Sequence, residues 1–528
     1  MPELLHESGS PASSTVAGTV EVGVGPLCFE DVVAVARGGA RVSITDEARA
    51  AIVRARATVD ELAAAATPAY GISTGFGALA TRHIPGDLRA QLQRSLVRSH
   101  AAGSGPMVER EVVRGLMLLR LSTLATGRTG VRPELAELVA EVLNAGITPV
   151  VHEYGSLGCS GDLAPLSHCA LALIGEGDVH DAHGVLMPAA QALEAAGLTP
   201  IQLVAKEGLA LINGTDGMLG MLVLALTDLA LLMRTADVAA AMSVEGQLAT
   251  DRVFAPELQA IRPHPGQALS AANLVAVLAG SGVVASHRGP DCNRVQDAYS
   301  LRCSPQVHGA ARDTLDHCAT VAGRELASAV DNPVVLEGRV ESNGNFHGAP
   351  VAYVLDFAAI VAADVASISE RRTDRFLDRA RSHGLPPFLA HDPGVDSGLM
   401  IAQYTQAAIV SELKRLANPA SVDSIPSSAM QEDHVSMGWA AARKLRRSVD
   451  GLTRVIAVEV LTAARALELR SPLQPAPATA AVIELLRANG VHGPGPDRHL
   501  SPEIEACVQL VRSGRVVSAV EAVVGELS

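Results

Sequence analysis

The sequence predicts an all-α fold, with a long central helical bundle and a loop-rich end. Aromatic residues make up only 2% of the chain, far fewer than an all-β protein would use. Alanine and leucine, which favour helix, supply much of the apolar content instead. Apolar residues also recur with helical periodicity over long segments in the middle of the chain. With 528 residues and 48% hydrophobic content, the protein can bury a sizeable core.

The first third of the chain reads as short helices separated by loops. Residues 1–20 are rich in Ser, Gly, Pro and Val and predict a flexible tail. A short amphipathic helix begins at Phe29, and a second opens at Thr45 with Asp and Glu in its first turn. Residues 68–77 form a Gly-rich loop that breaks the periodicity. Further helices are expected over 88–102, 110–125, 132–145 and 165–174.

The middle of the chain carries the long helical patterns. We expect helices over 217–245, 269–284, 304–326, 350–379, 398–416 and 440–469. The loops over 287–302, 331–348 and 418–436 hold most of the unusual polar residues. The predicted organisation is therefore a helical core over 21–515, containing a loop at 155–168 and a central bundle over 217–469, followed by a C-terminal tail over 516–528.

Charge and cysteine content exclude several classes of protein. The formal net charge of -14 repels nucleic acid and anionic membranes, so neither is an expected partner. Seven cysteines without a C-x-x-C pair argue against a disulfide framework and a structural zinc site, and we expect no bound metal. The N-terminus lacks a signal-peptide pattern, and the apolar stretch over 218–233 contains Asp228, which favours a buried helix. A cytoplasmic location is expected.

The most specific motif covers residues 155–168, which read Gly-Ser-Leu-Gly-Cys-Ser-Gly-Asp-Leu-Ala-Pro-Leu-Ser-His. In isolation, Ser160 or Asp162 could simply cap the following helix, with Pro165 in its first turn. The whole string is far more specific, and it resembles the prosthetic-group segment of the histidine and aromatic amino-acid ammonia-lyase family. The resemblance implies that three residues cyclise into a 4-methylidene-imidazol-5-one and that no external cofactor is needed.

The residue types suit that cyclisation, in which the amide nitrogen of the third residue attacks the carbonyl of the first and two waters are lost. Gly161 is required at the third position because a side chain would obstruct so tight a ring. The hydroxyl of Ser160 leaves and creates the methylidene. Cys159 supplies only its carbonyl, and it stands where relatives usually carry Ala. The product is a strong electrophile, which ordinary side chains do not provide, and it can capture the amine of an amino acid.

A second motif, residues 70–77, reads Tyr-Gly-Ile-Ser-Thr-Gly-Phe-Gly. A dinucleotide-binding loop is rejected because no strand–helix–strand unit surrounds it. A structural turn remains an alternative. The segment also resembles the mobile loop of the family, in which the tyrosine acts as the base, and Tyr70 takes that position here. Ser73 stands where many histidine lyases have Asn.

A third motif spans residues 296–308 and places three candidate substrate-binding residues together: Gln296, Tyr299 and Arg302. By resemblance, Arg302 clamps the substrate carboxylate with a bidentate pair, whereas a lone Arg in a loop is usually a solvated charge. His308 replaces a residue that is often apolar in relatives, and its role is open.

Two further positions match the family's pocket. Asn213, in the string Leu-Ala-Leu-Ile-Asn-Gly-Thr over 209–215, matches a contact to substrate or prosthetic group, although it could equally be a helix C-cap. Phe346, within 342–348, matches an aromatic pocket position, with core packing as the alternative.

By resemblance, three residues face the ring of the substrate. Glu432 stands where phenylalanine lyases tend to carry an amide, and a carboxylate suits an imidazole N–H or an imidazolium. A plain phenyl ring would leave that charge unpaired. Ser99 and His100 form a pair typical of histidine lyases. Tyrosine lyases also keep a His nearby, so His100 separates polar rings from phenyl better than imidazole from phenol, and a helix-surface His is the structural alternative. Met430 departs from the usual Asn near Glu432.

The resemblance runs over about residues 27–515, with the motifs in the family's order. It implies a homotetramer with active sites shared between subunits, and elimination of ammonia from L-histidine to give trans-urocanate. Two alternatives use the same electrophile: an ammonia-lyase for tyrosine or another aromatic amino acid, and a 2,3-aminomutase. A non-catalytic structural relative is a third, but Ser160, Gly161, Tyr70 and Arg302 are all present.

Overall fold

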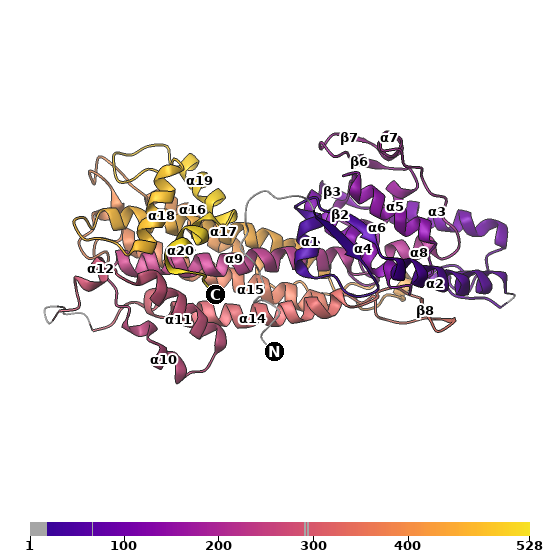
Figure 1. The fold of residues 1–528 in the computed structure, drawn as a ribbon, viewed down its shortest axis with the longest axis horizontal. Helices are drawn as coiled ribbons and strands as arrows, with labels where there is room; N and C mark the ends of the chain where they lie inside the picture. The colour runs from indigo at the N-terminus through magenta and orange to yellow at the C-terminus, as the bar shows by residue number, and fades with distance from the viewer. Residues whose placement is uncertain (1–17, 66, 290–291, 293–294) are drawn as a thin grey trace.

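A computed structural model describes residues 18–65, 67–289, 292 and 295–528. Figure 1 shows an elongated molecule in which long helices connect an N-terminal end to a C-terminal end. The predicted all-α architecture with a long central bundle is confirmed. Residues 1–17 of the predicted N-terminal tail lie outside the described residues, and the first strand begins at Thr19.

The bundle is built from four long helices that pack against one another along the molecule (Figure 1). Most side chains of α9 are buried because it is apolar on nearly all sides, as expected for the central helix of a large core. At 31 residues, α9 is about 46 Å long, and it therefore sets the distance between the two ends. The four are α9 (Asp216–Gly246), α14 (Ser304–Leu326), α15 (Ala349–Leu377) and α17 (Gly438–Glu468).

The N-terminal end combines short helices with small sheets. Strands β1 (Thr19–Val22) and β2 (Arg41–Ile44) pair in parallel, and the other sheets are antiparallel. The helices here are α1 (Phe29–Ala36), α2 (Asp46–Ala64), α3 (Arg89–His100), α4 (Arg110–Ala125), α5 (Pro133–Asn144), α6 (Leu163–Leu173), α7 (Ala189–Ala195) and α8 (Glu207–Ile212), with 3-10 turns η1 (Gly77–Leu79) and η2 (Gly86–Leu88). The remaining strands are β3 (Ser104–Met107), β4 (Thr148–Pro149), β5 (His152–Tyr154), β6 (Asp178–His180), β7 (Leu186–Pro188), β8 (Val334–Leu336) and β9 (Arg339–Glu341).

The C-terminal end is entirely helical among its described residues. Its elements are η3 (Arg252–Phe254), α10 (Pro256–Ala260), α11 (Pro265–Leu278), α12 (Gly282–Ala285), α13 (Tyr299–Arg302), η4 (Pro387–Leu389), α16 (Met400–Leu416), α18 (Pro477–Ala488), α19 (Ser501–Arg512) and α20 (Arg515–Val524). The segment 516–528, expected as a tail, lies within this fold. It forms most of α20, and the backbone N–H of Ser528 donates to the side-chain oxygen of Asn273 at 3.1 Å.

Most helix predictions agree with the structure, and the differences have local causes. The helix over 110–125 has the predicted bounds, whereas the single helix expected over 269–284 is split into α11 and α12. Gly280 causes the break, because its φ of +79° is incompatible with a right-handed helix. The two most apolar long helical segments, Glu207–Gly246 and Ala349–Leu377, have 78% and 67% of their most apolar windows buried, so they are core helices of the bundle.

Candidate active site

The segment that carries Cys159, Ser160 and Gly161 lies between β5 and α6, beside the N-terminus of α9. Gly161 has a φ of +76°, and a Cβ placed there would lie 2.1 Å from the carbonyl oxygen of Gly214. No larger residue fits this position without moving the backbone. The geometry therefore suits the cyclisation predicted for these three residues, which needs glycine third and a serine hydroxyl second.

Asp162 fixes this segment to the bundle in a way that the sequence did not indicate. It stands at the N-cap of α6, but its carboxylate accepts hydrogen bonds from the backbone N–H groups of Gly217 and Met218, both at 2.9 Å, in the first turn of α9. Ser156 donates to its other oxygen at 2.9 Å. Burial raises the pKa of Asp162 to about 7, against the lowering effect of these hydrogen bonds.

Asn213 contacts the same segment from the C-terminal end of α8. It is the C-cap residue of α8, as the structural alternative predicted, but its side chain also has a specific partner. The amide nitrogen donates to the backbone carbonyl of Ser160 at 2.7 Å. Asn213 is buried, so this hydrogen bond lies away from competing water. The structure thus brings Asn213 to the predicted prosthetic-group residues.

Glu432 is the acid that faces Ser160. Its carboxylate accepts from the Ser160 hydroxyl at 2.9 Å and from the Cys159 thiol at 3.1 Å. A further donor, the hydroxyl of Ser427, contacts it at 3.0 Å. Ser427 was not predicted, although it lies five residues before Glu432 in a segment already noted, and paired backbone hydrogen bonds between the two residues hold it there.

The loop of Tyr70 lies beside the segment that leads to Glu432. Tyr70 is half-buried, and its phenol oxygen accepts from the backbone N–H of Gly77 at 3.3 Å. The 3-10 turn η1 packs against η5 (Ser428–Met430), immediately after Ser427. The Tyr70 loop therefore packs against the segment that leads to Glu432.

Ser99 and His100 lie at the C-terminal end of α3. The Ser99 hydroxyl is 3.1 Å from Nδ1 of His100 and 3.1 Å from the carbonyl oxygen of Leu96. Burial lowers the pKa of His100, and the charge of Glu432 acts in the opposite direction. His100 therefore lies within electrostatic range of Glu432.

Phe346 belongs to the same end of the molecule. It lies two residues before Gly348, whose backbone N–H donates to the carbonyl of Gly158 at 3.0 Å. The neighbouring His347 contacts the carbonyl of His434 at 3.2 Å. The segment of Phe346 is thereby fixed between the Ser160 segment and the Glu432 segment.

The predicted carboxylate clamp lies elsewhere. Arg302 Nη2 donates to the side-chain oxygen of Gln296 at 3.0 Å, and the guanidinium stands over the Tyr299 ring, 4.7 Å from its centroid. Tyr299 is 71% exposed. Arg302 Nε is buried and has no hydrogen-bond partner among the described residues, so it is a donor available for an incoming acceptor.

One chain does not bring the two groups together. Ser160 lies beside the first turn of α9 through Asp162, whereas Asp297 binds the backbone N–H of Thr250, just beyond the end of α9. The length of α9, about 46 Å, separates the two regions. Gln296, Tyr299 and Arg302 thus lie at the opposite end of the bundle from the other predicted site residues.

Two residues that depart from the family's pattern, His308 and Met430, lie in contrasting environments. His308 is fully buried in α14, where its Nδ1 lies 2.7 Å from Asp237 on α9, so it belongs to the core of the bundle. Met430 is 67% exposed in η5, with a φ of +68°. Among the described residues, no three His, Cys, Asp or Glu side chains are grouped so as to hold a metal ion.

Comparison with known proteins places this geometry in a family. The model of the family described as "Aromatic amino acid lyase" matches residues 27–488. The chain belongs to the aromatic amino acid lyase family. The match covers the Tyr70 loop, the Ser160 segment, Arg302 and Glu432, so all the motifs noted in the sequence lie inside it.

Relatives and solved structures of this lyase family cover nearly the whole chain. A histidine ammonia-lyase of Streptomyces coelicolor is 68% identical over 510 residues, which is 96% of this chain and 99% of that one. One from Sorangium cellulosum is 50% identical over 514 residues, covering 95% and 99%. The structure of a tyrosine aminomutase from Streptomyces globisporus has a TM-score of 0.91 at 38% identity and covers 97% and 100%. A histidine ammonia-lyase from Trypanosoma cruzi has a TM-score of 0.87 at 38% identity and covers 96% and 95%.

Cys159 is expected to be inert as a thiol and dispensable for activity. Burial, with the hydrogen bond to Glu432, raises the pKa of Cys159 to about 12, so the reactive thiolate is scarce at neutral pH. Cys159→Ala should keep activity within about threefold, since the cyclisation uses only the backbone carbonyl and the one side-chain hydrogen bond lost comes from a weak thiol donor. Ammonia release measures the first effect, and mass spectrometry after iodoacetamide treatment measures the second. Rapid labelling of Cys159 at pH 7 in the folded protein would contradict this prediction.

Proposed function

We propose that this protein is an ammonia-lyase that converts L-histidine to trans-urocanate and ammonia. The observation that carries the proposal is the carboxylate of Glu432, 2.9 Å from the hydroxyl of Ser160. This places an acceptor for an imidazole N–H directly beside the residue whose hydroxyl is lost in cyclisation. When formed from residues 159–161, the methylidene-imidazolone supplies the electrophile that ordinary side chains lack.

The other residues have roles that follow from their chemistry. Glu432 and His100 orient the imidazole ring, and the Cys159 thiol and Ser427 hydroxyl that donate to Glu432 keep its carboxylate in place. Tyr70 takes the β-proton, assisted by the N–H of Gly77 that faces its oxygen. Arg302 binds the α-carboxylate, for which its unpartnered Nε and its Nη2 form a fork. Asn213 holds the Ser160 carbonyl, and Phe346, Gln296, Tyr299 and Ser99 line the pocket.

We further propose a homotetramer in which each site takes residues from more than one subunit. Arg302 and Ser160 of one chain cannot meet on one amino acid, because the length of α9 lies between them. Exposed apolar side chains follow one face of α15 at helical spacing, namely Tyr353, Phe357 and Ile360, at 51%, 42% and 46% exposure. An apolar stripe of this kind fits burial against another copy of the chain. The cytoplasmic location stays a proposal, supported by seven free cysteines.

Complementation between two inactive variants tests the shared site. Ser160→Ala and Arg302→Ala should each be inactive alone, whereas tetramers assembled from both should recover about a quarter of wild-type activity, because a random quarter of sites combine the intact end of each variant. The two proteins are co-expressed with different affinity tags, and mixed tetramers are purified through both tags. A mixture of separately purified homotetramers is the control. Inactive mixed tetramers would contradict the shared site.

The substrate is tested by incubating the purified protein separately with L-histidine, L-tyrosine and L-phenylalanine. Product absorbance and released ammonia are followed together. Urocanate with equimolar ammonia from histidine alone is the expected result. Coumarate or cinnamate would assign the alternative aromatic substrate, and a β-amino acid without ammonia would assign an aminomutase.

A further inference from the structure

The helix that carries Arg302 is very short. Helix α13 has only four residues, Tyr299–Arg302, and a helix of that length is unstable by itself. Its position therefore depends on what it contacts. Arg372 of α15 supplies one such contact: Nη1 donates to the backbone carbonyl of Ser300 at 3.3 Å and to the hydroxyl of Ser304 at 3.3 Å.

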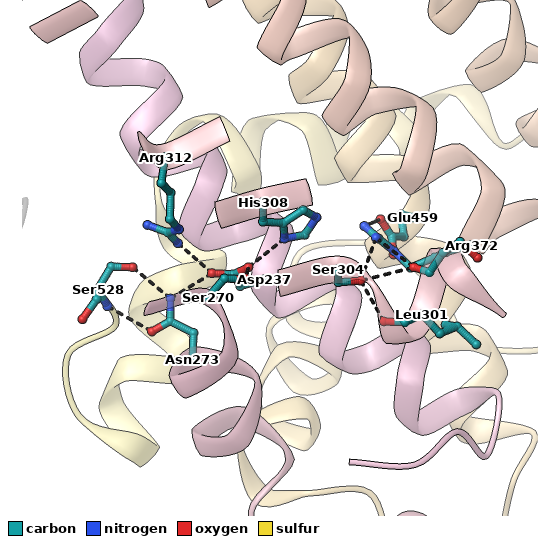
Figure 2. Close-up of polar contacts among 11 residues, drawn as sticks. Asp237, Ser270, Asn273, Leu301, Ser304, His308, Arg312, Arg372, Glu459 and Ser528 are labelled. Carbon is teal, nitrogen blue, oxygen red and sulfur yellow. Dashed lines mark hydrogen bonds and ion pairs between the residues drawn. The ribbon is translucent and has the colours of Figure 1, made fainter. Parts of the chain in front are cut away.

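Arg372 is itself held rigidly. Its side chain is fully buried and forms a two-pronged ion pair with Glu459 of α17, with distances of 2.5 Å from Nε and 2.9 Å from Nη2 (Figure 2). Glu459 also accepts from Ser243 of α9 at 2.7 Å and from Ser369 at 2.6 Å. The pair thus connects three helices of the bundle, and each oxygen of the Glu459 carboxylate accepts two hydrogen bonds.

Ser304 extends this connection to a second carbonyl of α13. Its hydroxyl accepts from Arg372 and donates to the carbonyl of Leu301 at 3.0 Å, as Figure 2 shows. The carbonyls of Ser300 and Leu301 precede Arg302 directly. A shift of Arg372 would therefore move the backbone from which the Arg302 side chain extends.

We propose that Arg372 is a positioning residue for the substrate's carboxylate, acting through α13 and Arg302. Its planar fork fits this task, because one edge binds Glu459 while the remaining nitrogen reaches α13. The proposal rests on the proposed function of Arg302 as the carboxylate clamp. It adds a buried residue that touches neither substrate nor prosthetic group.

A neighbouring buried cluster offers a matched control. Asp237 of α9 accepts from Arg312 of α14 at 2.6 Å and from His308 at 2.7 Å (Figure 2). Arg312, like Arg372, pairs its guanidinium with a buried carboxylate, although its side chain is 12% exposed. Among the described residues, the hydrogen-bond partner of its guanidinium lies on α9 and not on α13. A substitution of Arg312 therefore measures the effect of disturbing a bundle ion pair that does not hold α13.

The experiment compares Arg372→Lys with Arg312→Lys in the full-length protein. A lysine at 372 keeps the charge beside Glu459, but a single ammonium cannot bind that carboxylate and also hold α13. We expect KM for L-histidine to rise about tenfold in Arg372→Lys, with kcat within about threefold. The reason is that a displaced Arg302 loses charge-assisted contacts to the α-carboxylate of the substrate. Arg312→Lys should leave KM within about twofold while lowering the melting temperature similarly. Ser304→Ala keeps the ion pair and should raise KM by about threefold.

A double-variant cycle shows whether Arg372 acts through Arg302. In an Arg302→Lys background, adding Arg372→Lys should lower kcat/KM by no more than about twofold, because the clamp is already impaired. If the losses of kcat/KM in the two single variants multiply in the double variant, the proposal is overturned. An equal rise of KM in Arg312→Lys would also overturn it, as would a fall in kcat without a rise of KM in Arg372→Lys. If the wild type releases ammonia only from another amino acid, the histidine assignment fails, and the cycle is run with that amino acid, since every substrate has the α-carboxylate. If it releases none, the proposed function fails and the clamp with it.

Discussion

We expect Ser160→Ala to lose at least about 1,000-fold in ammonia release while the protein keeps its fold. Alanine has no hydroxyl to lose, so no methylidene can form, and no other side chain supplies an equivalent electrophile. The structural cost is small. Ser160 is only half-buried, and its hydroxyl is also lost when the wild type cyclises, so alanine should change stability by no more than about 1 kcal/mol.

Two measurements and one control accompany this variant. Pure, folded wild-type protein should show the ultraviolet absorbance of the prosthetic group, and Ser160→Ala should not. Ser427→Ala is the matched control, because it also removes a hydroxyl from Glu432, at 3.0 Å, without touching the three cyclising residues. That control should keep the absorbance and most of the activity. Full activity in Ser160→Ala would overturn the prosthetic-group hypothesis.

The long helices were predictable because their signals are local. Helical periodicity over 110–125 and 304–326 gave bounds that match α4 and α14. The strands escaped prediction because each has only two to four residues and finds its partner through tertiary contacts. The break at Gly280 was missed for a related reason, since a single glycine inside a helical pattern does not reveal its φ.

The candidate site was predicted through family motifs, residue by residue, but its arrangement was not. Asp162 looked like the cap of the next helix, whereas its carboxylate caps α9, 55 residues away. The sequence alone assigned no role to His308, which in the structure contacts Asp237, 71 residues away. Periodicity and motif spacing are local patterns and cannot predict contacts between residues so far apart in the sequence. The separation of Arg302 from Ser160 likewise depends on the length and direction of α9 within the bundle.

Glu432→Gln should lower kcat/KM for L-histidine by about 100-fold, because a charge-assisted hydrogen bond to the imidazole becomes a neutral one in a partly buried site. Folding should suffer less, since the amide still offers an acceptor to Ser160, Cys159 or Ser427. Phenylalanine has no N–H on its ring, so any turnover of it should not fall. Asp433→Asn, an exposed neighbour, is the control. Unchanged histidine kinetics in Glu432→Gln would remove Glu432 from the site, and with it the argument for an imidazole substrate.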